Sequence, residues 1–314
     1  MSSPIHTQKL SKAFRRNDAV RNLDLDVPAG SIYGLIGPNG AGKTTTIKLL
    51  MNILRPSAGS AAVLGVDSRR LAPAQLARIG YVSENQEMPD EMTVDYLLRY
   101  LRPFYPTWDE SLANEMVRQF DLPLDRRLRH LSRGMRMKAA LTSSLAYRPE
   151  LIILDEPFTG LDALVRHELI QGLLERADGT TILISSHDLA ELESFASHIG
   201  YLEDGRLQFH EEIGTLAERF RQVEVILGAD PALPKDWPAS WTQPQTASAV
   251  LRFVDRQFDQ ERTPAEIRRL FPGARNIACT PMPLKDIFVA LAVAGRSGTD
   301  DRFLSSVNRH SAPA

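Results

Sequence analysis

The sequence has little cysteine, no surplus of charge of one sign and no long apolar run. Its single cysteine, Cys279, excludes an internal disulfide and is typical of a reducing compartment. The formal net charge of -2 over 314 residues gives no electrostatic support for a nucleic-acid partner, and none is expected. No apolar run approaches the ~20 residues that a membrane-spanning helix needs, and the first residues have no signal-peptide layout. We therefore expect a cytoplasmic protein that does not itself form a channel.

One glycine-rich stretch organises the rest of the chain. Residues 37–44 read Gly-Pro-Asn-Gly-Ala-Gly-Lys-Thr, which is the spacing of a phosphate-binding loop. The apolar run 32–36 before it predicts a buried strand, and residues 44–54 after it predict a helix. Glycines let backbone N–H groups approach a triphosphate closely, and the positive end of the helix favours the anion. We expect Lys43 to contact the outer phosphates and the Thr44 hydroxyl to bind Mg²⁺.

Polar residues follow two further apolar runs, 151–154 and 181–184, which predict parallel strands covered on both faces. Asp155 and Glu156 follow the first run, and His187 follows the second. Because the carboxyl ends of parallel strands meet at one edge of a sheet, Asp155 is placed to hold Mg²⁺ beside the phosphate loop. Glu156 can accept a proton from the attacking water. By its position alone, His187 is equally compatible with a catalytic role and with an ordinary polar role.

The order of these segments predicts an α/β fold for residues 1–217, with a mostly helical insert at about 90–150. Residues 5–27 predict an antiparallel hairpin beside the nucleotide-binding strand. Phe14 in this hairpin could stack on an adenine or pack on a half-buried strand, and spacing alone favours packing.

The composition changes after Leu216 and predicts a small α/β accessory domain at 218–296, followed by a disordered tail at 297–314. Its expected strands are 223–227, 250–254 and 277–280, with a loop over 229–247. Thr263 to Glu266 reads as a helix start with a capping box, and 284–294 as a last helix.

Five motifs occur in the order G-P-N-G-A-G-K-T, L-S-R-G-M, I-I-L-D-E-P, T-G-L-D and S-S-H-D. In these motifs, over residues 5–215, the chain resembles the ATP-binding subunit of ABC transporters. The resemblance implies a P-loop NTPase of the ABC type with an antiparallel β subdomain, and an ATPase that uses ATP and Mg²⁺. It implies adenine stacking for Phe14. It implies ATP binding for Gly37, Pro38, Asn39, Gly40, Ala41, Gly42, Lys43, Thr44 and Thr45.

The same resemblance implies that Asp155 serves the metal, that Glu156 is the general base and that His187 senses the γ-phosphate. Residues 131–135, called the signature segment below, match the family motif that closes over the ATP bound to a second subunit. Asp162 matches the aspartate of a loop that faces the dimer partner.

The signature segment departs from the family pattern, which usually reads L-S-G-G-Q. Arg133 adds bulk and charge, and Met135 removes an amide. Ser132 and Gly134 are retained, so a hydroxyl and a helix N-terminus can still meet the γ-phosphate. We expect turnover to be altered rather than lost.

The loop after residues 81–83 departs as well. Glu84, rather than Gln86, is placed at the position of the usual glutamine. Its carboxylate would hold Mg²⁺ through water, more strongly than an amide.

One nucleotide site per chain, with a signature segment that acts across an interface, predicts a homodimer that closes on ATP. Separate transmembrane permease subunits would dock on the insert and on the loop near Glu84, and would hold the chain on the cytoplasmic face of the inner or plasma membrane. Residues 284–291 resemble the closing helix of ABC-2 exporters, which favours export. Two alternatives are a soluble ABC-type ATPase acting on nucleic acid or ribosomes, and a regulatory ATP-binding module with little turnover. The sequence has no long coiled coil, zinc cysteines or second ATP module to support the first, and Glu156 and His187 oppose the second.

Overall fold

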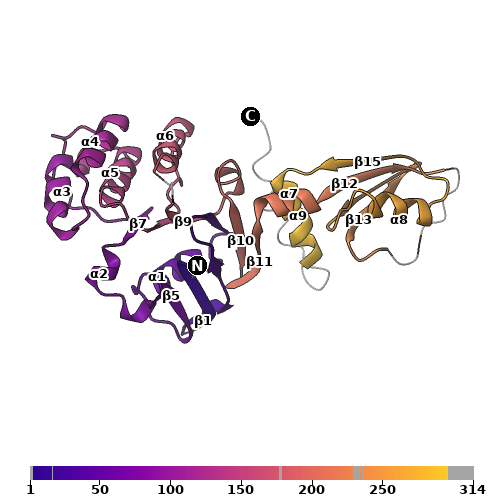
Figure 1. Ribbon diagram of the computed structural model, residues 1–314, viewed down its shortest axis with the longest axis horizontal. Helices are drawn as coiled ribbons and strands as arrows, with labels where there is room; N and C mark the ends of the chain where they lie inside the picture. Colours follow the sequence, from indigo (N-terminus) through magenta and orange to yellow (C-terminus); the bar gives the residue numbers. More distant parts are fainter. Residues whose placement is uncertain (1–2, 16, 177–178, 229–233, 235–236, 296–314) are drawn as a thin grey trace. The chain divides into compact units, whose positions relative to one another are not determined.

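The computed structural model in Figure 1 describes residues 3–15, 17–176, 179–228, 234 and 237–295. The chain forms two compact units, of which the first ends at Glu211 and the second begins at Glu212. The tail predicted at 297–314 lies outside the described residues. In the part of the chain that the structure describes, no helix has the length and apolar character needed to cross a bilayer.

A six-stranded sheet in the order β11-β10-β4-β9-β8-β7 forms the centre of the first unit. The strands from β10 to β7 pair in parallel, so the segments that follow β4, β7, β8 and β9 meet at one edge. Leu35, Ile153 and Leu183 are fully buried, as expected for strands covered on both faces. The strands are β4 (Ile32–Ile36), β7 (Ile79–Ser83), β8 (Leu151–Asp155), β9 (Thr181–Ser186), β10 (His198–Glu203) and β11 (Arg206–Glu212).

The N-terminal hairpin belongs to a second sheet, in the order β2-β1-β5-β6, with β3 paired to β1. The prediction that it lies beside the nucleotide-binding strand is wrong, because β4 pairs with β10 and β9 instead. Its strands pair in antiparallel fashion, β1 with β2, β3 and β5, and β5 with β6, so the predicted antiparallel subdomain is confirmed. Its strands are β1 (Ile5–Phe14), β2 (Asn17–Leu23), β3 (Asp26–Val27), β5 (Ala58–Val63) and β6 (Val66–Asp67).

Helix α1 (Lys43–Leu50) follows β4 and contacts β5 and β8. It is shorter than the predicted helix over 44–54, because Asn52 has a φ of 58° and ends the right-handed turns. Helices α2 (Pro73–Leu76) and α6 (Ala163–Leu174) of the first unit also lie outside the insert.

Helices α3 (Val94–Leu101), α4 (Glu110–Gln119) and α5 (Arg133–Leu145) form the predicted helical insert (Figure 1). Their N-terminal N–H groups are capped by the side chains of Thr93, Asp109 and Ser132. Helix α5 contacts both α3 and α4, which makes it the centre of the insert. The signature segment therefore lies at the N-terminus of the helix that the insert packs around.

The described residues of the second unit form a four-stranded antiparallel sheet in the order β13-β14-β12-β15 with three α-helices. Ile267 and Phe271 pack in its core with Val223, Leu251 and Phe253. The elements are α7 (Ile213–Arg219), β12 (Arg221–Ile226), β13 (Trp241–Ala247), β14 (Val250–Asp255), α8 (Arg262–Leu270), β15 (Arg275–Pro281) and α9 (Leu284–Gly295).

Two local predictions in this unit are wrong. Residues 241–247 form strand β13, although 229–247 was predicted to be a loop. The structure does not bear out the capping box at Thr263, because α8 begins at Arg262 and the Thr263 hydroxyl donates to Asp255 Oδ2 at 2.7 Å. Both side chains of that bond are buried, so the hydroxyl serves the core rather than the helix end.

Candidate active site

The loop between β4 and α1 depends on glycine at two points of close backbone approach. A Cβ at Gly37 would lie 2.1 Å from the carbonyl oxygen of Leu202 on β10. Gly42 has a φ of 106°, and a Cβ there would lie 2.3 Å from the carbonyl oxygen of Ala19. Any side chain at either position would displace the loop, so its shape requires glycine. The loop leads into α1 and directs the free N–H groups of that helix toward the cleft described below.

Lys43 is the buried positive charge of the site, with only 5% of its side chain exposed. Its Nζ donates to the carbonyl oxygens of Gly37 at 2.6 Å and Pro38 at 3.2 Å. The same nitrogen lies 3.0 Å from Oε1 of Glu156, whose side chain is 12% exposed. The ion pair between Lys43 and Glu156 therefore joins the phosphate loop to the predicted general base.

Asp155 ends β8 and is almost fully buried. Its Oδ1 accepts hydrogen bonds from the hydroxyls of Thr44 at 3.0 Å and Ser185 at 2.7 Å. Burial raises the pKa of Asp155, and these two hydrogen bonds only partly offset it. A cation beside this carboxylate would stabilise its ionised form, which is the property of a metal ligand.

Glu156 has an unusual backbone, with a φ of 51°. Non-glycine residues seldom adopt this region, and strain of this kind is concentrated at functional sites. The conformation is held by a hydrogen bond from the Glu156 N–H to Ser185 Oγ at 2.9 Å. Thr159 Oγ1 donates to Glu156 Oε2 at 3.0 Å, and His187 Nδ1 lies 2.7 Å from the same oxygen.

The pKa of Glu156 is lowered despite its burial. Burial alone would raise the pKa, but the contacts with His187 and Lys43 outweigh it. The side chain is therefore ionised at neutral pH, as a general base must be.

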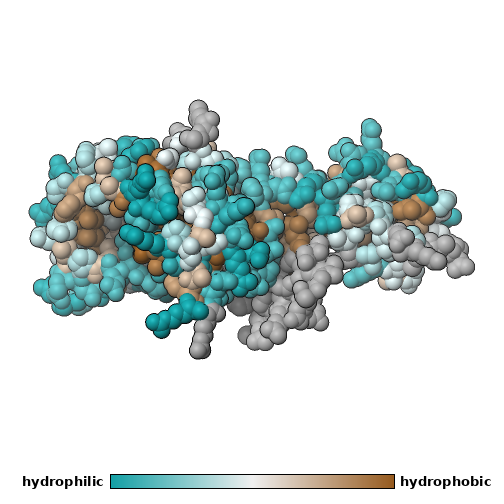
Figure 2. All heavy atoms as spheres, turned by 90° about the horizontal axis from the view of Figure 1, so that it is seen from below, coloured by the Kyte–Doolittle hydropathy of each residue, from teal (hydrophilic) through white to brown (hydrophobic). Residues whose placement is uncertain are grey.

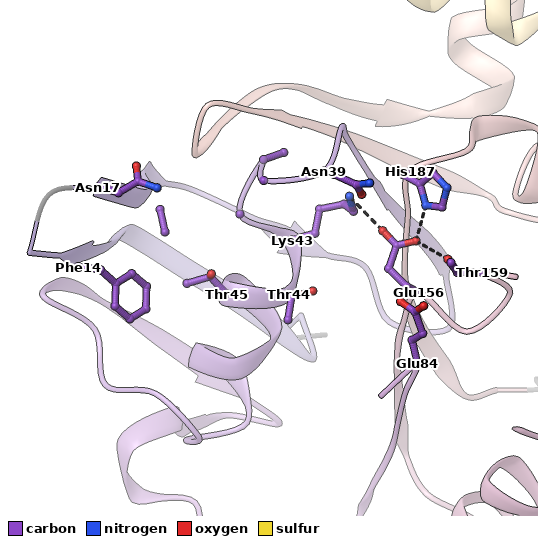
Figure 3. Close-up of a pocket in the computed structure, with 14 residues that line it drawn as sticks. Phe14, Asn17, Asn39, Lys43, Thr44, Thr45, Glu84, Glu156, Thr159 and His187 are labelled. Atoms are coloured by element: carbon purple, nitrogen blue, oxygen red, sulfur yellow. Dashed lines mark hydrogen bonds and ion pairs between the residues drawn. The ribbon is translucent and has the colours of Figure 1, made fainter. Parts of the chain in front are cut away.

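Lys43, Glu156 and His187 line one cleft of about 570 Å³, whereas Asp155, which accepts from Thr44, is not part of the lining. Figure 3 shows Lys43, Glu156 and His187 pointing toward one another, with Phe14 at the other end of the cleft. Phe14 is 44% exposed, so its ring is not packed in a core and is available for stacking. The lining residues are Phe14, Asn17, Ala19, Asn39, Gly40, Ala41, Gly42, Lys43, Thr44, Thr45, Glu84, Glu156, Thr159 and His187.

Asn17, Ala19 and Thr159 line the cleft but are not among the residues predicted from the sequence. Gly37 and Pro38 are not part of the lining. Their carbonyl groups instead hold Lys43 in place. Thr159 could have been found from its spacing, because it follows Glu156 by three residues on the turn that leaves β8.

The donor groups near Thr44 suit a hard divalent cation. The Thr44 hydroxyl, the Asp155 carboxylate and the Glu84 carboxylate are oxygen ligands of the kind that Mg²⁺ prefers. Glu84 lines the cleft and its N–H donates to the Asp155 carbonyl at 2.9 Å. Gln86 is exposed and is not part of the lining, and its side chain accepts from the Ser83 N–H at 3.4 Å. Among the described residues, no cluster of three His, Cys, Asp or Glu could hold a metal by itself, so part of the coordination would come from nucleotide and water.

The signature segment and Asp162 do not line the cleft of their own chain. Ser132 caps α5 by accepting from the Met135 N–H at 3.2 Å, and Asp162 caps α6 by accepting from the Val165 N–H at 2.9 Å. Ser132 and Asp162 are exposed. Gly134 is buried, and a Cβ there would lie 2.8 Å from Val165 Cγ1, so Gly134 lets α5 pack closely on α6.

Comparison with known proteins agrees with this fold. The model of the ABC transporter family matches residues 20–159. The ABC transporter ATP-binding protein YtrB of Bacillus subtilis (strain 168) is 33% identical over 228 residues, covering 72% of this chain and 78% of YtrB. The Nod factor export ATP-binding protein I of Burkholderia orbicola (strain AU 1054) is 31% identical over 305 residues, covering 92% of this chain and 97% of that protein.

A solved structure described as the ATP-binding subunit of an ABC transporter shares the fold with a TM-score of 0.63 and 27% identity. It covers 69% of this chain and 92% of the other. The predicted ABC-type α/β fold is thereby confirmed, as is the predicted ATPase class. The chain belongs to the ABC transporter family and is an ATP-binding subunit that hydrolyses ATP.

Proposed function

We propose that the chain is one half of a dimeric ATPase whose active sites are each completed by the signature segment of the other chain. The observation that carries the proposal is the separation of two groups of residues within one chain. Lys43, Glu156 and His187 line the cleft, whereas Ser132 and Asp162 are exposed outside it. A second copy could bring its Ser132 hydroxyl and the N-terminus of its α5 to a γ-phosphate held in the cleft.

Within the cleft, Lys43 and Glu156 would part when ATP binds. Lys43 would leave the carboxylate for the outer phosphates, where its charge is needed. Glu156 would then be free to accept a proton from the attacking water, and its lowered pKa keeps it ionised for that step. His187, beside Glu156 Oε2, would orient that carboxylate or the water.

Mg²⁺ would be held by Thr44 and Asp155, with Glu84 at its outer side through water. When bound, the cation supplies charge stabilisation for the transferring phosphoryl group. Phe14 would stack on the adenine at the far end of the cleft, which its exposed ring supports.

We also propose that separately encoded transmembrane subunits dock on the helical insert and hold the chain at the cytoplasmic face of the membrane. An exposed row of aromatic side chains on α3 and the turn after it supports an interaction surface there. Tyr96, Tyr100 and Phe104 are 53%, 47% and 60% exposed, and neighbouring ring centroids lie 6.4 and 5.5 Å apart. Aromatic residues are enriched at protein interfaces. The direction of transport is proposed to be export, as in the Nod factor relative.

The test is ATP hydrolysis by the wild type beside Glu156→Gln. Loss of the base should lower kcat by about 10²- to 10⁴-fold, while ATP binding, measured with a fluorescent ATP analogue, should persist. Glu203→Gln, on β10 and away from the lining of the cleft, is the matched control. Equal rates for Glu156→Gln and the wild type would overturn the assignment of the base.

A further inference from the structure

The loop after β7 and the segment that leads into α5 are joined by several ion pairs. Glu84, Asp90 and Glu91 lie on the loop, and the partners lie between residues 127 and 136. Arg136 Nη2 is 2.7 Å from Asp90 Oδ1, and Arg127 Nη1 is 3.0 Å from Glu91 Oε2. The pairs are Glu84–Arg133, Asp90–Arg136, Glu91–Arg127 and Glu91–Arg129.

Only the pair formed by Glu84 and Arg133 reaches the cleft. Glu84 lines the cleft, whereas Asp90 and Glu91 do not. Arg133 Nη2 donates to Glu84 Oε1, and the two side chains are 47% and 26% exposed. The guanidinium also covers Gly160, where a Cβ would lie 3.1 Å from Arg133 Nη1. Arg133 therefore touches two segments that border the cleft, although it begins α5 outside it.

We propose that Arg133 is a positioning residue that holds Glu84, and that their ion pair transmits occupation of one chain's cleft to the signature segment of the same chain. The inference rests on the proposed function, in which that segment completes the partner's site. The inference also explains two departures from the family pattern together. Glu84 stands where the family usually has glutamine, and Arg133 stands where it usually has glycine, and these two charged residues pair with each other.

The direction of this coupling follows from charge. Glu84 and Glu156 bring two carboxyl groups to the lining of the cleft, and Asp155 adds a third that contacts the lining residue Thr44. Lys43 is paired with only one of the three, Glu156. Arg133 supplies the counter-charge for Glu84 in the nucleotide-free chain. A divalent cation that enters with ATP would compete with Arg133 for Glu84 and so release Arg133. The N-terminus of α5 would then lose one of its links to the loop and could shift toward a partner chain, while the pairs of Asp90 and Glu91 remain.

The experiment is hydrogen–deuterium exchange on the full chain carrying Glu156→Gln, at a concentration where sedimentation shows a single monomeric species, with and without Mg-ATP. In this parent we expect Mg-ATP to change exchange in peptides covering both 37–45 and 131–137. The change in the second peptide should be about two- to five-fold, the range for a pair of this exposure. Arg133→Gly should abolish the response at 131–137 and leave the response at 37–45. Glu84→Gln should also abolish the response at 131–137.

Two further variants separate coupling from folding. The exchanged pair Glu84→Arg with Arg133→Glu restores an ion pair but leaves no carboxylate at position 84 for the cation, so it should keep the Tm of the parent and still lack the response at 131–137, whereas a purely structural role of the pair would restore that response. Glu91→Gln breaks neighbouring ion pairs between the same two segments and should keep both responses.

A response at 131–137 that survives Arg133→Gly would overturn the proposal. So would a response that Glu91→Gln abolishes as fully as Arg133→Gly. The absence of any response at 37–45 in the parent would instead refute ATP binding, and the proposed function would fail together with the inference.

Discussion

The ion pair between Lys43 and Glu156 allows a prediction for the nucleotide-free chain. Replacing Lys43 with methionine keeps the length of the side chain but removes its charge. Glu156 would then keep only Thr159 and His187 as side-chain partners, and the Gly37 carbonyl would lose its 2.6 Å hydrogen bond. Breaking a buried charge pair from one side costs about 3–5 kcal/mol when no other partner remains. With two partners left and 12% of Glu156 exposed, we expect a cost of about 2 kcal/mol.

Thermal unfolding without nucleotide measures this cost. For a unit of this size, about 2 kcal/mol corresponds to a fall in Tm of about 4–8 °C. Adding Glu156→Gln to Lys43→Met removes the carboxylate that has lost its ion-pair partner. The double variant should therefore recover about 1 kcal/mol of the free energy of unfolding. Mg-ATP at 100 times its Kd should add about 2.7 kcal/mol to the free energy of unfolding of the wild type and so raise its Tm. The Tm of Lys43→Met should not change, because this variant does not bind ATP. Strictly additive losses in the double variant would refute the ion pair as a stabilising contact.

Three further predictions concern separate residues. Ser132→Arg should leave the affinity for a fluorescent ATP analogue within about two-fold of wild type, because the new side chain does not enter the cleft of its own chain. It should lower ATPase activity at least 10-fold, because the bulk blocks the site of the partner chain. ATPase activity equal to that of the wild type would contradict this. Asp155→Asn keeps an oxygen that can accept from Thr44 and Ser185 but removes the carboxylate charge. Burial raises the pKa of the Asp155 carboxyl group, so the charged form is unfavourable in the nucleotide-free chain. The nucleotide-free Tm should therefore rise at pH 7, and the gain should shrink as the pH is lowered and Asp155 becomes protonated, while Mg-dependent hydrolysis is lost; a lower Tm at pH 7 would be the opposite of what burial predicts. Gly134→Ala places a Cβ 2.8 Å from Val165 Cγ1, so it should destabilise the chain by about 1–3 kcal/mol, and an unchanged urea midpoint would show that α5 and α6 are not in close contact.

The sequence was most informative where function requires fixed spacing. The phosphate loop, Asp155, Glu156 and His187 could be predicted because each follows a strand whose apolar run is unbroken. Parallel strands then bring their carboxyl ends to one edge without further information. Glu84 was predicted to lie at this edge, and the structure places it in the lining of the cleft.

What sequence reasoning missed depends on contacts between distant residues. The partner strand of the N-terminal hairpin is β5, and nothing in residues 5–27 specifies that choice. Strand β13 contains Pro244, and the sequence before it is rich in Pro, Trp and Asp, so the local pattern favours a loop, although pairing with β14 makes residues 241–247 a strand. The sequence around Thr263 resembles a helix cap, but in the structure its hydroxyl donates to Asp255, eight residues earlier in the chain.

The accessory unit illustrates the same division between local and distant information. Its strands β12, β14 and β15 correspond to the predicted strands 223–227, 250–254 and 277–280, and they pair as an antiparallel sheet. Hydrophilic and apolar residues are interspersed on the face of the molecule shown in Figure 2.

The ion pairs between residues 84–91 and 127–136 could not be predicted from motif spacing, because the paired charges lie some 40 residues apart in the sequence.

The central proposal is that one chain holds ATP and another chain completes the site. Sedimentation velocity of the full chain with Glu156→Gln tests it most directly, because this variant should bind Mg-ATP without consuming it. We predict a monomer without nucleotide and a dimer with Mg-ATP, and no dimer when Ser132→Arg is added. A chain that binds Mg-ATP and remains monomeric at concentrations well above those of the protein in the ATPase assay would contradict the composite site.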